Sequence, residues 1–129
     1  MKTRIRLFLF CLTGLMISAI AQAGNLEKDI LNYTNQYRRA QGKPELRSAP
    51  VLDEQAARHS SNMAGGKTPF GHNGFKDRVN AASKDIGRIS AAAENVAYGD
   101  MDAREVVDGW IKSKPHRKNM LGEIGRAHV

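Results

Sequence analysis

Two histidines and one glutamate are the residues of this chain whose types and settings best suit chemistry. They are His72 in F-G-H, Glu94 in A-E-N and His116 in S-K-P-H-R. Imidazole exchanges protons near neutral pH and, when neutral, binds zinc, whereas a carboxylate can act as a general base. The two histidines lack H-E-x-x-H or C-x-x-C spacing, so spacing alone does not show that they meet. Any shared site requires a fold that gathers three distant segments.

Helical periodicity marks the first elements that must position these side chains. A helix is predicted from an N-cap at Asn25 to a C-terminal stop at Gly42, because apolar residues recur at helical spacing between them. A second helix is predicted to begin near Pro50, whose missing N–H is harmless in a first turn, and to end at Gly65. Lys43 to Leu46 is interpreted as a short ordered loop between the two helices.

The candidate residues lie in or beside loops. Residues 67–74, which carry His72, are rich in turn-forming residues. A helical stretch is predicted over 75 to about 82, and the pattern over 83–90 is ambiguous. The segment 94–98 (E-N-V-A-Y) is too short for a helix before Gly99, which favours a short strand beginning at Glu94.

The C-terminal third predicts a helix, a helical turn and a strand. Asp102 with Glu105 three positions later is typical of a capping box at a helix start. Residues 116–121 are predicted to form a helical turn after Pro115, and 124–129 to begin a strand.

The N-terminus has the pattern of a secretory signal peptide. Lys2, Arg4 and Arg6 precede an apolar run over 7–20, and A-Q-A follows at 21–23. The run is shorter than the roughly 20 residues of a spanning helix. We therefore expect residues 1–23 to be removed, leaving a secreted or periplasmic protein with no stable membrane span after cleavage.

Composition narrows the chemistry of the remaining domain, residues 24–129. The chain has one cysteine, Cys11, which lies in the leader, so a cysteine nucleophile, a thiolate zinc site and a disulfide scaffold are excluded from that domain. Its basic residues form no stripe with interleaved aromatics, which excludes nucleic acid as the expected partner. Arg38, Arg39 and Lys43 are interpreted as a solvated helix face.

The order of several motifs resembles the CAP superfamily, which comprises cysteine-rich secretory proteins, antigen 5, plant pathogenesis-related proteins and bacterial SCP-like relatives. The resemblance covers the chain from about Leu31 to its end. Its six blocks are Asn35–Leu46, Leu52–Ala64, Phe70–His72, Asp77–Val79, Ala93–Gly99 and Val106–Leu121.

The resemblance implies an α+β fold, a three-layer α-β-α sandwich whose cleft gathers two histidines and two glutamates. His72, Glu94 and His116 match three of those positions, whereas Ser113 stands where the second glutamate is expected. The family's I-G strand and a further strand should follow the last block, but the chain stops at Val129, so we expect about one strand to be lacking and stability to be marginal. The lower negative charge at Ser113 weakens the case for a metal.

Two functions follow from the resemblance. The first is an exported binding module whose cleft takes a small ligand, a lipid, a cell-envelope component or a divalent metal such as zinc, with His72 and His116 as metal ligands and Asn95 and Ser113 at the ligand. The alternative is a metal-assisted hydrolase of peptides, esters or glycans with Glu94 as general base. Asn95 is expected mainly to hold loop backbone, and Arg117 and Asn119 to brace the turn that carries His116. An inactive product of an altered gene is a third reading.

Overall fold

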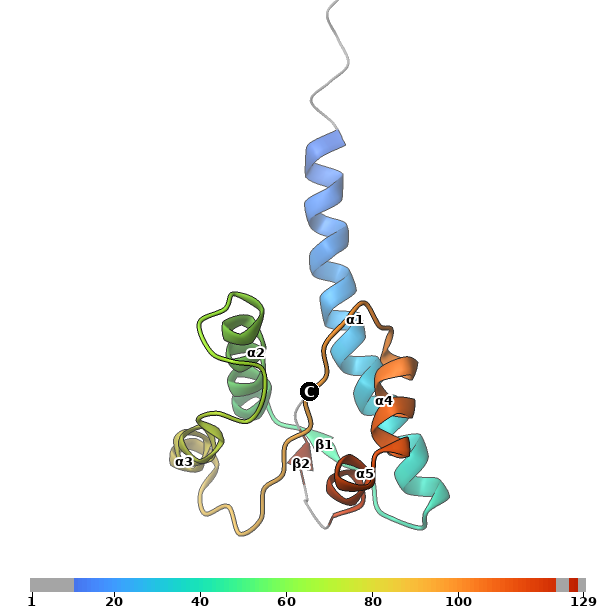
Figure 1. The fold of residues 1–129 in the computed structure, drawn as a ribbon, viewed down its shortest axis with the longest axis vertical. Coiled ribbons are helices and arrows are strands. Elements are labelled where there is room, and N and C mark those ends of the chain that lie inside the picture. The colour runs from blue at the N-terminus through green and yellow to red at the C-terminus, as the bar shows by residue number, and fades with distance from the viewer. Residues whose placement is uncertain (1–10, 123–125, 128–129) are drawn as a thin grey trace, which may run out of the picture.

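The computed structural model describes residues 11–122 and 126–127 (Figure 1). Over these residues the chain forms five helices and two short strands. In chain order they are α1 (Cys11–Ala40), β1 (Arg47–Ser48), α2 (Pro50–Ala64), α3 (Phe75–Ile86), α4 (Ala103–Lys112), α5 (Lys114–Leu121) and β2 (Arg126–Ala127). The candidate residues all lie in the described part of the chain.

The first helix begins earlier than its sequence pattern indicates. We predicted a start with Asn25 as the N-cap, which is wrong, because α1 runs without a break from Cys11 to Ala40. The residues around Asn25 include Ala, Gln, Leu and Glu, which continue a helix readily, so no cap is needed there. Within the described residues, no helix has both the length and the apolarity needed to cross a membrane.

The helices form two groups. In the first group α1 packs on α4 and α5, and in the second α2 packs on α3. The hydrophobic core lies in the first group, where Ile30 of α1 meets Val106 and Val107 of α4 and Met120 of α5. Val107 is only 2% exposed. Trp110 packs against this core, and its indole Nε1 donates to the carbonyl oxygen of Val96 at 3.3 Å.

Strand structure is sparser than predicted. The strands β1 and β2 pair in parallel, with Arg47 opposite Arg126 and Ser48 opposite Ala127. Part of the strand predicted over 124–129 is thus present as β2, and its other residues lie outside the described ranges. The strand predicted over 94–98 is wrong, because that segment pairs with no strand among the described residues. The expected three-layer sandwich is not confirmed.

Most helix ends follow their local signals. The capping box of α4 is present, since Asp102 accepts from the Glu105 backbone N–H and the Glu105 carboxylate accepts from the Asp102 N–H, both at 2.9 Å. The ambiguous stretch after residue 82 continues α3 to Ile86, and Gly87, with φ of 81°, ends it. The helical turn predicted over 116–121 is α5.

The prediction that Arg38 lies on a solvated helix face is wrong. Its residue is 1% exposed, and its guanidinium donates to the carbonyl oxygens of Pro44 at 2.8 Å, Met120 at 2.6 Å and Gly122 at 2.9 Å. Desolvation lowers the pKa of this guanidinium from its ordinary value. Arg38 therefore fastens α1 to the loop before β1 and to the end of α5.

Candidate functional site

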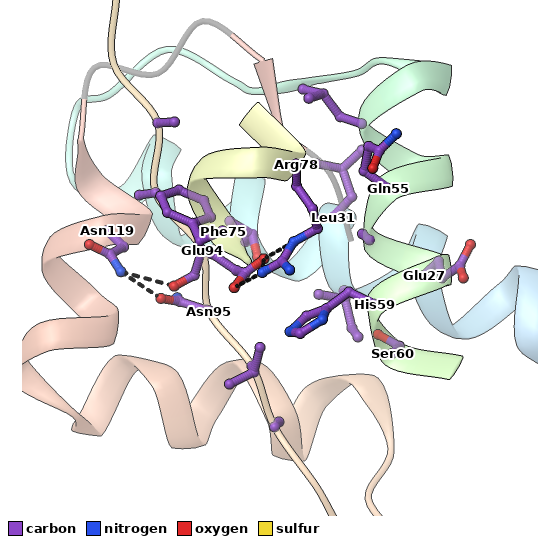
Figure 2. Close-up of a pocket in the computed structure, with 18 of the residues that line it drawn as sticks. Glu27, Leu31, Gln55, His59, Ser60, Phe75, Arg78, Glu94, Asn95 and Asn119 are labelled. Carbon is purple, nitrogen blue, oxygen red and sulfur yellow. Dashed lines mark hydrogen bonds and ion pairs between the residues drawn. The ribbon is translucent and has the colours of Figure 1, made fainter. Parts of the chain in front are cut away.

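Glu94 is the centre of a buried ionic cluster. It lies on the segment between α3 and α4, and its side chain is 6% exposed. Arg78, near the start of α3, donates from Nε to Oε2 at 3.1 Å and from Nη2 to Oε1 at 2.8 Å and Oε2 at 2.7 Å. His72 Nδ1 lies 2.9 Å from Oε1. Figure 2 shows the Arg78 side chain reaching from α3 to this carboxylate.

The cluster holds Glu94 in its ionised form. Burial alone would raise the pKa of the Glu94 carboxyl, but the hydrogen bonds from His72 and Arg78 and the nearby charges of Arg78 and His59 outweigh it, so the pKa is lowered. An ionised carboxylate only accepts hydrogen bonds. His72 must therefore donate through Nδ1, which leaves its Nε2 edge for another partner.

His72 is presented on a loop that other residues hold in place. The buried imidazole of His59, on α2, contacts the carbonyl oxygen of Gly71 through Nε2 at 2.7 Å. The carbonyl of His72 itself accepts from the Phe75 N–H at the start of α3 at 3.0 Å. The side chain of His72 remains 53% exposed. Its free edge is thus accessible while its backbone is fixed.

His116 lies on the first turn of α5 and contacts Ser113. Its Nδ1 is 2.9 Å from the Ser113 hydroxyl, and its ring centroid is 6.4 Å from that of Trp110. Ser113 is the residue between α4 and α5, so it ends one helix and precedes the next. The hydroxyl at this position therefore orients His116, as the Glu94 carboxylate orients His72.

Two asparagines join the Glu94 and His116 segments. Asn119 Nδ2 donates to the carbonyl oxygen of Glu94 at 3.2 Å and to Asn95 Oδ1 at 2.9 Å, and Asn95 Nδ2 donates to the carbonyl oxygen of His116 at 3.1 Å. Arg117 donates to the carbonyl oxygen of Ile111 at 2.9 Å. The predicted bracing roles of Asn95, Asn119 and Arg117 are confirmed.

The structure therefore assembles the predicted site in part. The side chains of His72 and Glu94 meet, and the backbones of Glu94 and His116 are bridged. Among the described residues no hydrogen bond joins the two predicted imidazoles, and no group of three His, Cys, Asp or Glu side chains is placed to hold a metal. Asn95 uses its amide in internal hydrogen bonds.

Sequence reasoning missed Arg78 and His59 as members of this site. Arg78 lies in the D-R-V block, but a cation near a helix start carries no signal of a carboxylate 16 positions away. His59 lies on the inner face of α2, where it is 5% exposed. In the sequence, the available signal was a histidine at helical spacing among the apolar residues of this helix.

A cavity of about 580 Å³ adjoins this cluster. Residues of all five described helices line it, together with the segment from Arg88 to Gly99. Its walls are mainly apolar, and they include Leu31, Leu52, Met63 and Val79. In Figure 2, His59 projects from α2 into this space, and the Arg78–Glu94 pair forms a polar part of its wall.

Comparison with known proteins places the chain in a family. The sequence model described as "CAP: Cysteine-rich secretory protein family" matches residues 31–123. In Bacillus subtilis (strain 168), the uncharacterized membrane protein YlbC is 34% identical over 100 residues, which cover 74% of this chain and 28% of YlbC.

A second relative in the same organism is the uncharacterized protein YkwD. It is 30% identical over 111 residues, or 84% of this chain and 43% of YkwD. The chain thus spans less than half the length of either relative. No solved structure matches it. The matched range covers most of the sequence and contains His72, Glu94 and His116, so this chain belongs to the CAP family of cysteine-rich secretory proteins.

Proposed function

We propose that this protein is an exported binding module that takes an apolar or amphipathic small ligand, such as a lipid, in the cavity between its helix groups. The observation that carries the proposal is the cavity itself. Its volume of about 580 Å³ lies within the range of small-molecule sites, and its walls combine apolar side chains with a few polar groups. Export is inferred from the leader over 1–23.

The polar part of the cavity wall suits recognition better than catalysis by Glu94. A general base works best with a pKa near the working pH. The pKa of Glu94 is lowered instead, and both of its oxygens already accept hydrogen bonds. The hydrolase with Glu94 as base stays an untested prediction, and the geometry favours a binding role.

The experiment measures binding of an apolar fluorophore and its displacement by a long-chain fatty acid. Ala56 lines the cavity from α2, and Ala56→Trp would fill part of it. Ser61→Trp adds the same ring at an exposed position of the same helix. We expect saturable binding by the wild type and by Ser61→Trp, and at least tenfold weaker binding by Ala56→Trp. Equal binding by the two variants would contradict the proposal.

A second candidate function is divalent metal binding by His72 and His116. The observation that favours it is the His72–Glu94 pair, because metal-binding imidazoles commonly donate their other N–H to a carboxylate. The donor types suit zinc, because each ring has its Nδ1 engaged by a neighbouring oxygen and its Nε2 left for a metal. Water or a bound ligand would complete the four-coordinate shell typical of zinc.

Zinc titration at pH 7.5 and pH 5.5 tests this candidate. Metal binding requires neutral imidazoles, so affinity should fall at the lower pH. The double variant His72→Ala/His116→Ala should lose at least tenfold in affinity at pH 7.5, whereas His128→Ala, at a residue outside the described ranges, serves as the control. Equal affinity of the double variant and the control would rule out these ligands.

A further inference from the structure

His59 is a polar side chain enclosed in the cavity wall. It lies on α2, the residue is only 5% exposed, and it lines the cavity. Figure 2 shows its imidazole projecting from α2 into this space. A buried polar atom is unfavourable in an apolar setting unless it has a hydrogen-bond partner. The roles of the two ring nitrogens therefore bear on which ligand the cavity accommodates.

The contact with Gly71 gives the two ring nitrogens of His59 different roles. Nε2 lies 2.7 Å from the carbonyl oxygen of Gly71. A carbonyl oxygen only accepts hydrogen bonds, so Nε2 must carry the N–H. A neutral imidazole has one N–H, which leaves Nδ1 with a lone pair. The neutral ring of His59 therefore presents a hydrogen-bond acceptor at its second nitrogen.

The ionic cluster adds further acceptors to the same wall. Glu94 is held in its ionised form, and an ionised carboxylate only accepts hydrogen bonds. Arg78 lines the cavity too, but it directs Nε and Nη2 at Glu94 and Nη1 at the carbonyl oxygen of Asn73. This polar part of the wall therefore suits a ligand group that donates a hydrogen bond better than a group that only accepts.

A carboxylate head group would meet this part of the wall unfavourably. It would bring a second negative charge towards Glu94 and would offer no donor to His59. Burying an ionised carboxylate costs far more than burying a hydroxyl that makes a hydrogen bond. Arg88 also lines the cavity, but it is exposed, so a carboxylate held there would remain in water. An uncharged hydroxyl is the head group that matches the enclosed polar wall.

We propose that His59 is the head-group site of the cavity, at which Nδ1 accepts a hydrogen bond from the hydroxyl of a long-chain alcohol. The hydrocarbon chain of the ligand would lie against apolar lining residues such as Leu31, Met63 and Val79. The inference rests on the proposed function of the cavity as a ligand site. It narrows the ligand class to uncharged amphiphiles with a hydroxyl head.

Competition between a bound apolar fluorophore and three ten-carbon ligands tests the inference on the whole chain. The ligands are 1-decanol, decyl methyl ether, whose oxygen cannot donate a hydrogen bond, and decanoate. The measurement is made at pH 8.0, where an imidazole of ordinary pKa is neutral. We expect 1-decanol to bind about tenfold more tightly than the ether or decanoate, because it alone donates a hydrogen bond to the enclosed acceptor.

The variant His59→Gln separates the two ring nitrogens. The glutamine amide can still donate to the carbonyl oxygen of Gly71, but it places no acceptor at the position of Nδ1. We expect this variant to lose the preference for 1-decanol. Ser60→Ala removes a different polar group from the lining, on the same helix, and should keep the preference. Fluorophore binding by both variants checks that the cavity persists.

The remaining outcomes separate this inference from the proposed function. If the wild type bound the three ligands equally, or bound decanoate most tightly, the head-group site would be overturned and the proposed function would stand. Retention of the alcohol preference by His59→Gln would likewise overturn His59 as the acceptor. If neither the fluorophore nor any of the three ligands bound, both the head-group site and the proposed function would be overturned.

Discussion

Arg78 donates hydrogen bonds to both carboxylate oxygens of Glu94, whose side chain is only 6% exposed. Its Nη2 lies 2.8 Å from Oε1 and 2.7 Å from Oε2, and its Nε lies 3.1 Å from Oε2. Arg78 also donates from Nη1 to the carbonyl oxygen of Asn73 at 2.7 Å. One guanidinium therefore neutralises the candidate carboxylate and fixes the loop beside His72. These donors are used inside the protein, whereas the half-exposed side chain of His72 keeps one edge open to solvent.

Removal of Arg78 should destabilise the protein strongly. Arg78→Gln leaves the buried carboxylate without its counter-charge, for which we expect a loss of about 3 kcal/mol in the free energy of unfolding measured in urea. The double variant Arg78→Gln/Glu94→Gln removes the unpaired buried carboxylate as well and should recover part of that loss. In the exposed Arg58–Glu54 pair, Arg58→Gln should change stability by less than about 1 kcal/mol. Equal effects at the two sites would contradict the buried cluster.

Acid should weaken the protein through Glu94 in a defined direction. The pKa of Glu94 is lowered in the folded state from its ordinary value of 4.5. A carboxyl with a lowered folded pKa contributes stability above the unfolded pKa and loses it as the pH falls through the folded pKa. The stability advantage of the wild type over Glu94→Gln should therefore be constant near neutral pH and shrink below about pH 4.5. Urea unfolding at several pH values measures it, and an advantage that grew on acidification would show the opposite shift.

Arg38 should matter far more than its neighbour on the same helix. Arg38→Leu removes the donors to three carbonyls, two of which lie at the end of α5, so we expect a loss of about 3 kcal/mol in unfolding free energy. Arg39 is exposed and pairs with Glu45 at the surface, so Arg39→Leu should cost less than about 1 kcal/mol. Thermal unfolding of the two variants decides it. A similar melting temperature for both would mean that the buried bonds add little.

Local signals predicted the helices because their causes lie within a few residues. The capping box at Asp102 and the glycine after Ile86 act on neighbouring backbone groups, so the sequence contains both partners. The strand expected from Glu94 to Tyr98 failed for the opposite reason. A strand exists only with a partner, and the described partner of β1 is β2, far along the chain.

The site was predictable in its residue types but not in its connections. The motifs identified His72 and Glu94, which do meet. They did not show that Arg78 would neutralise Glu94. Nor did they show that Arg38 would be buried and donate to a carbonyl oxygen more than 80 positions away. Charged side chains are usually solvated, so a sequence alone favours exposure until the fold supplies buried partners. Long-range polar contacts were therefore the part that needed coordinates.

The hydrogen bonds of Asn119 and Asn95 predict which of two Asn→Asp variants loses more stability, because Asn119 donates twice and Asn95 once. Asn119→Asp keeps the shape but removes the donors to Glu94 and to Asn95, whereas Asn95→Asp removes the donor to His116 and still accepts from Asn119. Each lost hydrogen bond contributes about 1 kcal/mol, so Asn119→Asp should lose about 2 kcal/mol of unfolding free energy and Asn95→Asp about 1 kcal/mol. Asn80→Asp, at an exposed position, controls for the added charge. A new carboxylate at position 95 or 119 lies near Glu94, so charge repulsion adds to both losses. The ranking of the two variants is therefore a sharper test than the size of either loss. Urea unfolding that ranked Asn95→Asp as the more damaging change would assign the bridge's main donor to Asn95 rather than to Asn119.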